Sequence, residues 1–152
     1  MYFQILCIGK IKEEFYRRQI EEICTKLQKG QHKIRIIEYP DSPVPERLSE
    51  KKREVFLEKE CAKLAEKITA RDYVIALCIE GRELSTKQHR RYIEEAAMQE
   101  FETITYVIGG SLGLPENIKK RANLCMSFSR MTFPHQIMRM VLCEEIRSAL
   151  YL

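Results

Sequence analysis

The apolar positions of this chain fall into short continuous runs that are separated by longer amphipathic stretches. The runs predict five strands, the last of them short, at residues 2–8, 33–38, 73–79, 103–108 and 124–126. Residues 2–8 are apolar except for Gln4, so they lack the alternation of a strand with one wet face. This pattern is typical of a parallel sheet that is covered on both sides.

The stretches between these runs have helical periodicity. They predict helices over residues 13–27, 49–67, 85–99 and 115–121, and a last helix from Pro134 onward. Ser85 with Gln88 three residues later forms the pattern of a capping box. In the first two helices, apolar residues recur at helical spacing and predict buried stripes. The stripes are Phe15, Ile20, Ile23 and Leu27 in the first helix and Leu57, Cys61, Leu64 and Ile68 in the second.

Strands and helices alternate over the whole length, without a linker, an internal repeat or a low-complexity segment. We therefore expect a single domain spanning residues 1–152 and an α/β fold, with a mostly parallel sheet and helices on both faces. In open α/β sheets, ligands bind where the carboxyl ends of the strands meet. This rule directs attention to Leu77, to Gly109 and to the segment 127–133.

The composition is that of an ordinary water-soluble protein, with 45% hydrophobic and 32% charged residues. The sequence has no membrane span and no signal-peptide pattern, so we expect a cytoplasmic protein without a membrane partner. The six cysteines are isolated in apolar surroundings and lack CxxC spacing, which favours reduced thiols and no metal. A net charge of +4 permits an acidic partner such as nucleic acid without requiring one.

Two loops carry the candidate chemistry. Gly109-Gly110 and Gly113 allow close approach of backbone to a ligand, although a plain turn explains them equally well. The segment 127–135 offers hydroxyls, apolar walls and the cation Arg130. Its alternative interpretation is a connection to the last helix, with Thr132 as a hydroxyl cap near Pro134.

Both loops, with part of the last helix, resemble the RlmH family of ribosomal RNA methyltransferases. The matching motifs are Val107-Ile-Gly-Gly-Ser-Leu-Gly-Leu114, Ser127-Phe-Ser-Arg-Met-Thr-Phe-Pro-His-Gln136 and Arg139-Met-Val-Leu-Cys-Glu-Glu145. The resemblance implies a SPOUT methyltransferase fold with a C-terminal trefoil knot, and a homodimer. It also implies that S-adenosylmethionine is used to methylate N3 of a pseudouridine in 23S rRNA within the ribosome.

The resemblance also assigns residues by position. The implied cofactor-binding residues are Leu77, Gly109, Phe128, Ser129, Arg130, Met131, Thr132 and Phe133. His135 and Arg139 lie four residues apart on one helix face and are the candidate catalytic residues. Equally open is a structural role, with His135 packing at the helix start and Arg139 pairing with a carboxylate. His32 and His89 are expected at the surface.

The end of the sequence departs from the family pattern. Arg147-Ser148 stands where the family has Tyr-Arg, and the family's tail ending in Tyr-His does not follow. Two hypotheses therefore remain, an active rRNA methyltransferase and a catalytically impaired member that binds cofactor or ribosome. The last helix is apolar nearly all round between Ile137 and Leu150, which predicts a two-fold homodimer built largely on this helix.

Overall fold

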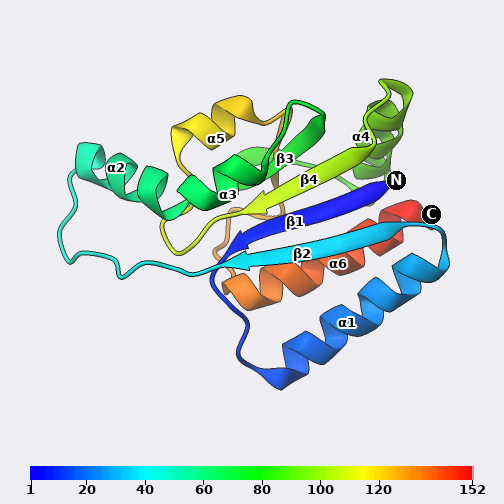
Figure 1. Cartoon of the computed structure of the whole chain (residues 1–152), viewed down its shortest axis with the longest axis horizontal. Coiled ribbons are helices and arrows are strands. Elements are labelled where there is room, and N and C mark those ends of the chain that lie inside the picture. Colours follow the sequence, from blue (N-terminus) through cyan, green and yellow to red (C-terminus); the bar gives the residue numbers. More distant parts are fainter. Residues whose placement is uncertain (152) are drawn as a thin grey trace.

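The computed structural model describes residues 1–151 and contains a five-stranded sheet in which all neighbouring strands are parallel (Figure 1). The strand order is β2-β1-β4-β3-β5. The strands are β1 (Tyr2–Ile8), β2 (Lys33–Tyr39), β3 (Asp72–Glu83), β4 (Thr103–Ile108) and β5 (Leu124–Ser127). The predicted α/β class with a parallel sheet is confirmed.

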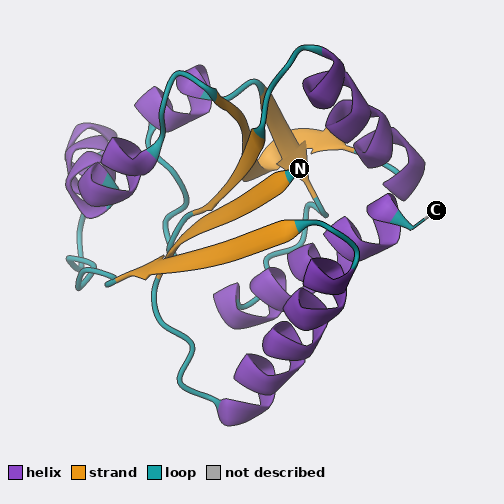
Figure 2. Ribbon diagram, turned by 45° about the vertical axis from the view of Figure 1, so that its right-hand side comes forward, coloured by secondary structure: helices purple, strands orange, loops and turns teal. Residues whose placement is uncertain are grey.

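Helices cover both faces of the twisted sheet (Figure 2). They are α1 (Glu14–Lys29), α2 (Glu50–Glu60), α3 (Ala62–Lys67), α4 (Thr86–Met98), α5 (Glu116–Arg121) and α6 (His135–Leu150). On one face, α6 packs between α1 and α4, and on the other face α3 and α5 lie over the sheet. None of the helices within residues 1–151 combines the length and the apolar character that crossing a bilayer requires.

Strand β1 shows why the sheet is buried on both sides. Phe3, Ile5 and Cys7 belong to the core cluster beneath α1, α4 and α6, while Leu6 and Ile8 belong to the cluster beneath α3 and α5. All five are fully buried, so successive residues of one strand supply two separate cores. The absence of polar alternation in this segment has this direct structural cause.

The capping box of α4 is confirmed, because the Ser85 and Gln88 side chains each bond the other residue's backbone N–H. The single long helix predicted over residues 49–67 is wrong, since the backbone leaves helical geometry at Cys61 and separates α2 from α3. Leu57, Cys61 and Leu64 are nevertheless buried as predicted. The change of direction lets α3 follow the sheet while α2 projects away from it (Figure 1).

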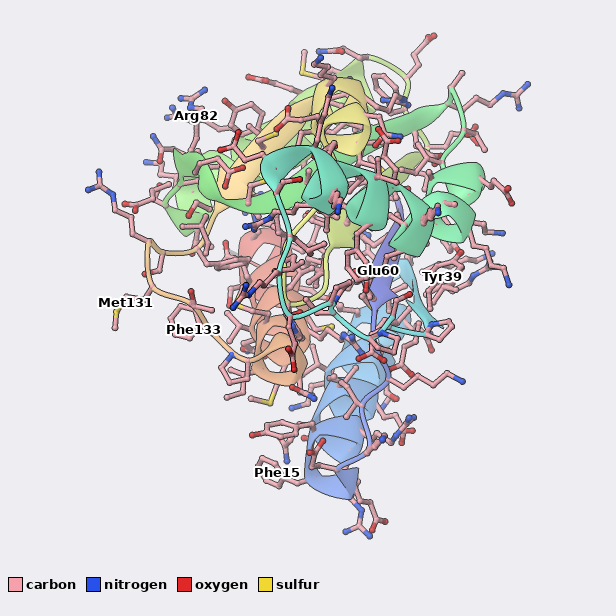
Figure 3. All side chains as sticks on the ribbon, turned by 90° about the vertical axis from the view of Figure 1, so that its left-hand side faces the viewer. Phe15, Tyr39, Glu60, Arg82, Met131 and Phe133 are labelled. Atoms are coloured by element: carbon pink, nitrogen blue, oxygen red, sulfur yellow. The ribbon has the colours of Figure 1, made fainter. Side chains whose placement is uncertain are left out.

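The stripe predicted for the first helix is partly wrong. Ile20, Ile23 and Leu27 are buried, but Phe15 is 64% exposed at the end of α1 (Figure 3). Tyr16 packs against the core instead. Because Tyr16, Ile20, Ile23 and Leu27 follow spacings of four, three and four, they describe the helical stripe better than Phe15 does.

Strand β3 extends beyond its predicted end and is interrupted there. Leu77 and Arg82 both pair with Met126 of β5, so residues 78–81 bulge out of the ladder. A Cβ at Gly81 would lie 2.7 Å from the carbonyl oxygen of Cys125, which means that only glycine fits this approach of the two backbones. The bulge forms one wall of the cavity described next.

Candidate functional site

A cavity of about 300 Å³ lies at the carboxyl ends of β3, β4 and β5. Its size is at the lower end of the range for small-molecule pockets. Its walls are the β3 bulge, the glycine turn after β4 and the loop after β5, with contributions from Arg53, Lys119, His135 and Met138. The implied cofactor-binding residues on this lining are Leu77, Gly109, Phe128, Ser129, Met131, Thr132 and Phe133. The fold thus brings together three strand ends that lie far apart in the sequence.

The glycine turn is held in a narrow geometry. Gly113 N–H donates to the carbonyl of Gly110 over 3.1 Å, and Gly113 has a φ of +87°, which favours glycine. A Cβ on Gly109 would overlap the carbonyl of Gly113. The turn therefore presents bare backbone to the cavity, and a larger residue at 109 requires the turn to open.

Hydroxyl groups shape the loop after β5. Ser127 Oγ donates to the carbonyl of Ser129 over 3.1 Å, and Ser129 Oγ accepts from Met131 N–H over 3.0 Å. Met131 is 72% exposed and Phe133 is 40% exposed, and both project from the loop (Figure 3). Pro134 stands at the N-cap of α6 without a side-chain cap, so the alternative in which Thr132 caps this helix is wrong.

Arg130 is separated from the other predicted cofactor residues. It lies outside the cavity and lines a neighbouring shallow hollow with Glu80, Gly81 and Glu83 of the β3 bulge. Its side chain is exposed. In this structure, Arg130 is a rim cation beside the cavity rather than part of its wall.

His135 is the first residue of α6 and lies on the cavity lining, half-buried. Burial lowers the pKa of His135, the positive charge of Arg139 lowers it further, and Asp41 opposes both effects. The imidazole is therefore neutral at pH 7 and able to accept a proton.

Arg139 is not on the cavity lining. Its side chain is 1% exposed and its guanidinium donates to Glu38 Oε2 at 2.6 Å and to the carbonyls of Ile8 and Gly9 at 2.8 and 2.7 Å. These contacts tie α6 to the ends of β1 and β2. The structure therefore matches the alternative in which Arg139 pairs with a carboxylate. Of the two candidate catalytic residues, His135 lies on the cavity lining and Arg139 does not.

Three charged residues of the cavity wall, Arg53, Glu80 and Lys119, were not predicted from the sequence as site residues. Arg53 Nη2 donates to the carbonyl of Leu112 over 3.1 Å, and Lys119 Nζ lies 2.5 Å from Glu80 Oε1. The hydrogen bond from Lys119 lowers the pKa of Glu80. Arg53 and Lys119 belong to basic clusters that look like solvated helix faces, so their sequence gave no signal for a role at a pocket.

Burial also determines the protonation state of the thiol of Cys78, another residue of the cavity lining. Desolvation raises the pKa of its thiol to about 12, so Cys78 stays protonated and is a poor nucleophile at neutral pH. Within residues 1–151, no group of three or more His, Cys, Asp and Glu side chains is arranged to hold a metal ion.

The expectation that His89 lies at the surface is wrong. Its side chain is 1% exposed, with Nε2 2.7 Å from the Tyr106 hydroxyl and Nδ1 3.1 Å from Glu145 Oε1. His89, Ile93 and Ala96 are the buried residues of α4, and their spacing of four and three was a readable signal. His32 is half-buried, with its ring 5.9 Å from that of Phe3, so it is not a fully exposed residue either.

Comparisons with known proteins add a family context. A family model described as "Predicted SPOUT methyltransferase" matches residues 1–151. A protein of Streptococcus uberis named "Ribosomal RNA large subunit methyltransferase H" is 42% identical over 149 residues, which are 98% of this chain and 93% of the relative. A protein of the same name from Leuconostoc citreum is 39% identical over the same shares of both chains.

Among solved structures, a probable methylase family protein from Haemophilus influenzae has a similar fold. Its TM-score is 0.54 at 11% sequence identity, and the match covers 98% of this chain and 66% of the other. At this identity the similarity concerns the fold.

Proposed function

The chain belongs to the SPOUT methyltransferase family, and we propose that it transfers a methyl group from S-adenosylmethionine to N3 of a pseudouridine in 23S rRNA. The names of relatives about 40% identical over nearly the whole chain support the rRNA substrate. The observation that carries the proposal is the cavity itself, in which the two motif loops and the end of β3 converge.

The cavity lining suits the cofactor in shape and chemistry. Gly109 and Gly113 leave a backbone cradle, and a Cβ at Gly109 could not be accommodated there. Apolar groups from Leu77, Phe128 and Met131 can pack against a nucleoside. When bound, S-adenosylmethionine supplies a methyl group on a positively charged sulfur. Seven of the eight implied cofactor residues would hold it directly, and Arg130 would act from the rim.

The chain's own residues contribute to the transfer in two ways: they position the methyl donor and the acceptor, and they accept the proton from N3. Holding donor and acceptor in one geometry removes much of the entropic barrier of a two-molecule reaction. The N3–H of a pseudouridine must lose its proton, and the neutral His135 at the cavity wall is the residue we assign to accept it. We assign Arg139 the role of fixing the first turn of α6 and thereby the place of His135.

The proposal includes a homodimer, the trefoil knot and a single cytoplasmic domain. Support for the dimer comes from α6, where Val141 is 37% exposed and Ile137, Met138 and Met140 are half-buried. A second copy that covers this apolar face would stabilise the pair. Light scattering at micromolar concentration should give the mass of a dimer, and a monomer would contradict this part of the proposal.

Two measurements test the activity. Calorimetry should detect binding of S-adenosylhomocysteine in the absence of metal, and tritiated methyl groups should enter ribosomes that lack the modification. Ribosomes already modified serve as the control substrate. Binding without transfer would favour the impaired member of the family, whereas no binding at all would contradict the proposal.

A further inference from the structure

Helix α2 contacts the cavity wall through polar side chains. Leu57 is the buried residue of this helix, and α2 otherwise projects from the sheet (Figure 1). In the N-terminal half of α2, Arg53 Nη2 donates to the carbonyl of Leu112 over 3.1 Å, and Glu54 Oε1 accepts from Glu116 N–H over 2.6 Å. These two bonds fix the start of α2 against the glycine turn and the start of α5.

The charges on the cavity lining are unequally compensated. Lys119 has Glu80 at 2.5 Å and Glu116 at 3.8 Å, so its positive charge is offset by carboxylates. Within residues 1–151, Arg53 has no carboxylate within ion-pair distance, and its guanidinium donates to the neutral carbonyl of Leu112. Arg53 is thus the cation of the described lining whose charge no anion offsets.

We propose that Arg53 binds the carboxylate of the amino-acid portion of the cofactor, an inference that rests on the proposed use of S-adenosylmethionine. A guanidinium presents several N–H donors in a planar fork that matches a carboxylate, and the bond to Leu112 uses one of them. That bond also holds the side chain at the cavity before a ligand arrives, which reduces the entropy lost on binding. A phosphate of RNA is the other anion that a guanidinium at this position could bind.

Two ligands separate the carboxylate from the rest of the cofactor. S-adenosylhomocysteine carries the amino-acid portion, whereas 5′-methylthioadenosine keeps the nucleoside and the sulfur but lacks the carboxylate. Their affinities are to be measured by calorimetry on the wild-type protein and on Arg53→Met, Arg53→Lys and Lys52→Met. Lys52→Met is the matched control, because it removes one positive charge from the adjacent position of the same helix. Circular dichroism and thermal melting of each variant establish that it is folded.

In Arg53→Met we expect S-adenosylhomocysteine to bind at least about tenfold more weakly, the scale of one lost charge-assisted hydrogen bond. The affinity for 5′-methylthioadenosine should change by less than about twofold on the same scale. Arg53→Lys should recover part of the loss because it keeps the charge, and Lys52→Met should bind both ligands as the wild type does.

Other outcomes overturn the inference in recognisable ways. An equal loss for both ligands would mean that Arg53 acts through the Leu112 carbonyl and the shape of the turn. Unchanged affinity for both, with a raised KM for ribosomes, would assign Arg53 to an RNA phosphate. If Lys52→Met lost as much affinity for S-adenosylhomocysteine as Arg53→Met, the effect would come from the net charge of the helix and not from a direct contact of Arg53. If the wild-type protein binds neither ligand, the proposed function fails together with this inference.

Discussion

The ends of two neighbouring strands, β1 and β4, show how the same sheet edge can be closed in one place and open in another. Each strand leads into glycine, at Gly9 and at Gly109. After β1, the Arg139 guanidinium fills the space and donates to the carbonyls of Ile8 and Gly9. After β4, the cavity remains open and His135 lies at its wall.

Both residues come from the first two turns of α6, four positions apart. One turn of helix therefore separates a side chain that completes the protein's own hydrogen bonds from one that faces a ligand space. The comparison teaches that a cation near a glycine turn is not by itself evidence of a site. What distinguishes the end of β1 is that both terminal nitrogens of the Arg139 guanidinium already donate within the fold, although its Nε has no partner among the described residues.

The strongest test of this comparison is Arg139→Met. Removing the guanidinium takes this donor away from the carbonyls of Ile8 and Gly9 and from Glu38, which keeps the Ile11 N–H at 2.7 Å and Arg17 at 3.7 Å. Breaking a buried ion pair typically costs about 3–5 kcal/mol. Because Glu38 keeps 23% exposure, we expect a loss near the lower limit, about 3 kcal/mol of unfolding free energy, measured by urea denaturation.

Arg147→Met provides the control for this loss. Arg147 pairs with Glu144 at the surface, where solvent screens the pair, so its removal should leave the urea midpoint close to that of the wild type. If Arg139→Met kept wild-type stability and lost methyl transfer, Arg139 would be a catalytic residue. The assignment of a structural role to the end of β1 would then be contradicted.

A pair of glycine variants sharpens the contrast. In Gly109→Ala the new Cβ overlaps the carbonyl of Gly113, so the turn must open, and we expect S-adenosylhomocysteine to bind at least about tenfold more weakly. In Gly9→Ala the Cβ would lie 3.5 Å from Arg139 Nη2, an ordinary contact, but a φ of +92° strains an alanine by about 1 kcal/mol. That variant should lose stability and keep cofactor affinity. Equal effects of both substitutions on binding would contradict the division into a closed and an open end.

The smallest expected effect is the pH dependence that His135 contributes. Its pKa is lowered from 6.5 in the folded protein, first by burial and then by Arg139, so the folded state binds fewer protons than the unfolded chain. The stabilising contribution is present above pH 6.5 and is lost as pH falls through the folded pKa. His135→Gln should flatten the curve of urea midpoint against pH below pH 6.5, the range in which the unfolded chain binds the proton that the folded protein binds less readily. Part of the slope should remain, since burial and the N-terminal charge also lower the pKa of His32.

The sequence predicts the sheet well because apolar runs and helical periodicity report local burial directly. Strand β1 is the clearest case, since its lack of polar alternation corresponds to two cores. The capping box at Ser85 is equally local, since both of its bonds join residues three apart. The break at Cys61 is not local. It depends on where α3 meets the sheet, which the spacing of Leu57, Cys61 and Leu64 does not encode.

The distinction between local and long-range determinants also explains which parts of the candidate site could be predicted. Glycine and hydroxyl-rich loops at strand ends identified the cavity, because parallel strands place their carboxyl ends together. The roles of single side chains depended on partners more than a hundred residues away, as with Arg139 and Glu38, or on a projecting helix, as with Arg53 and Leu112. His89 is the exception, since its helical register with Ile93 and Ala96 already marked it as buried.

The strand order has a consequence for how the chain acquires its structure. Strand β1 pairs with β2 close by in sequence, but its other neighbour is β4, and Gln4 bonds Thr105 across 101 positions. At a synthesis rate of about 5–20 residues per second, β4 is completed on the order of ten seconds after β2. Until then, the edge of β1 that pairs with β4 is open. Contacts so distant in sequence slow folding and leave hydrophobic surface transiently exposed. Because β1 lies between β2 and β4, the first strand to be synthesised is enclosed in the sheet only after β4 has been made.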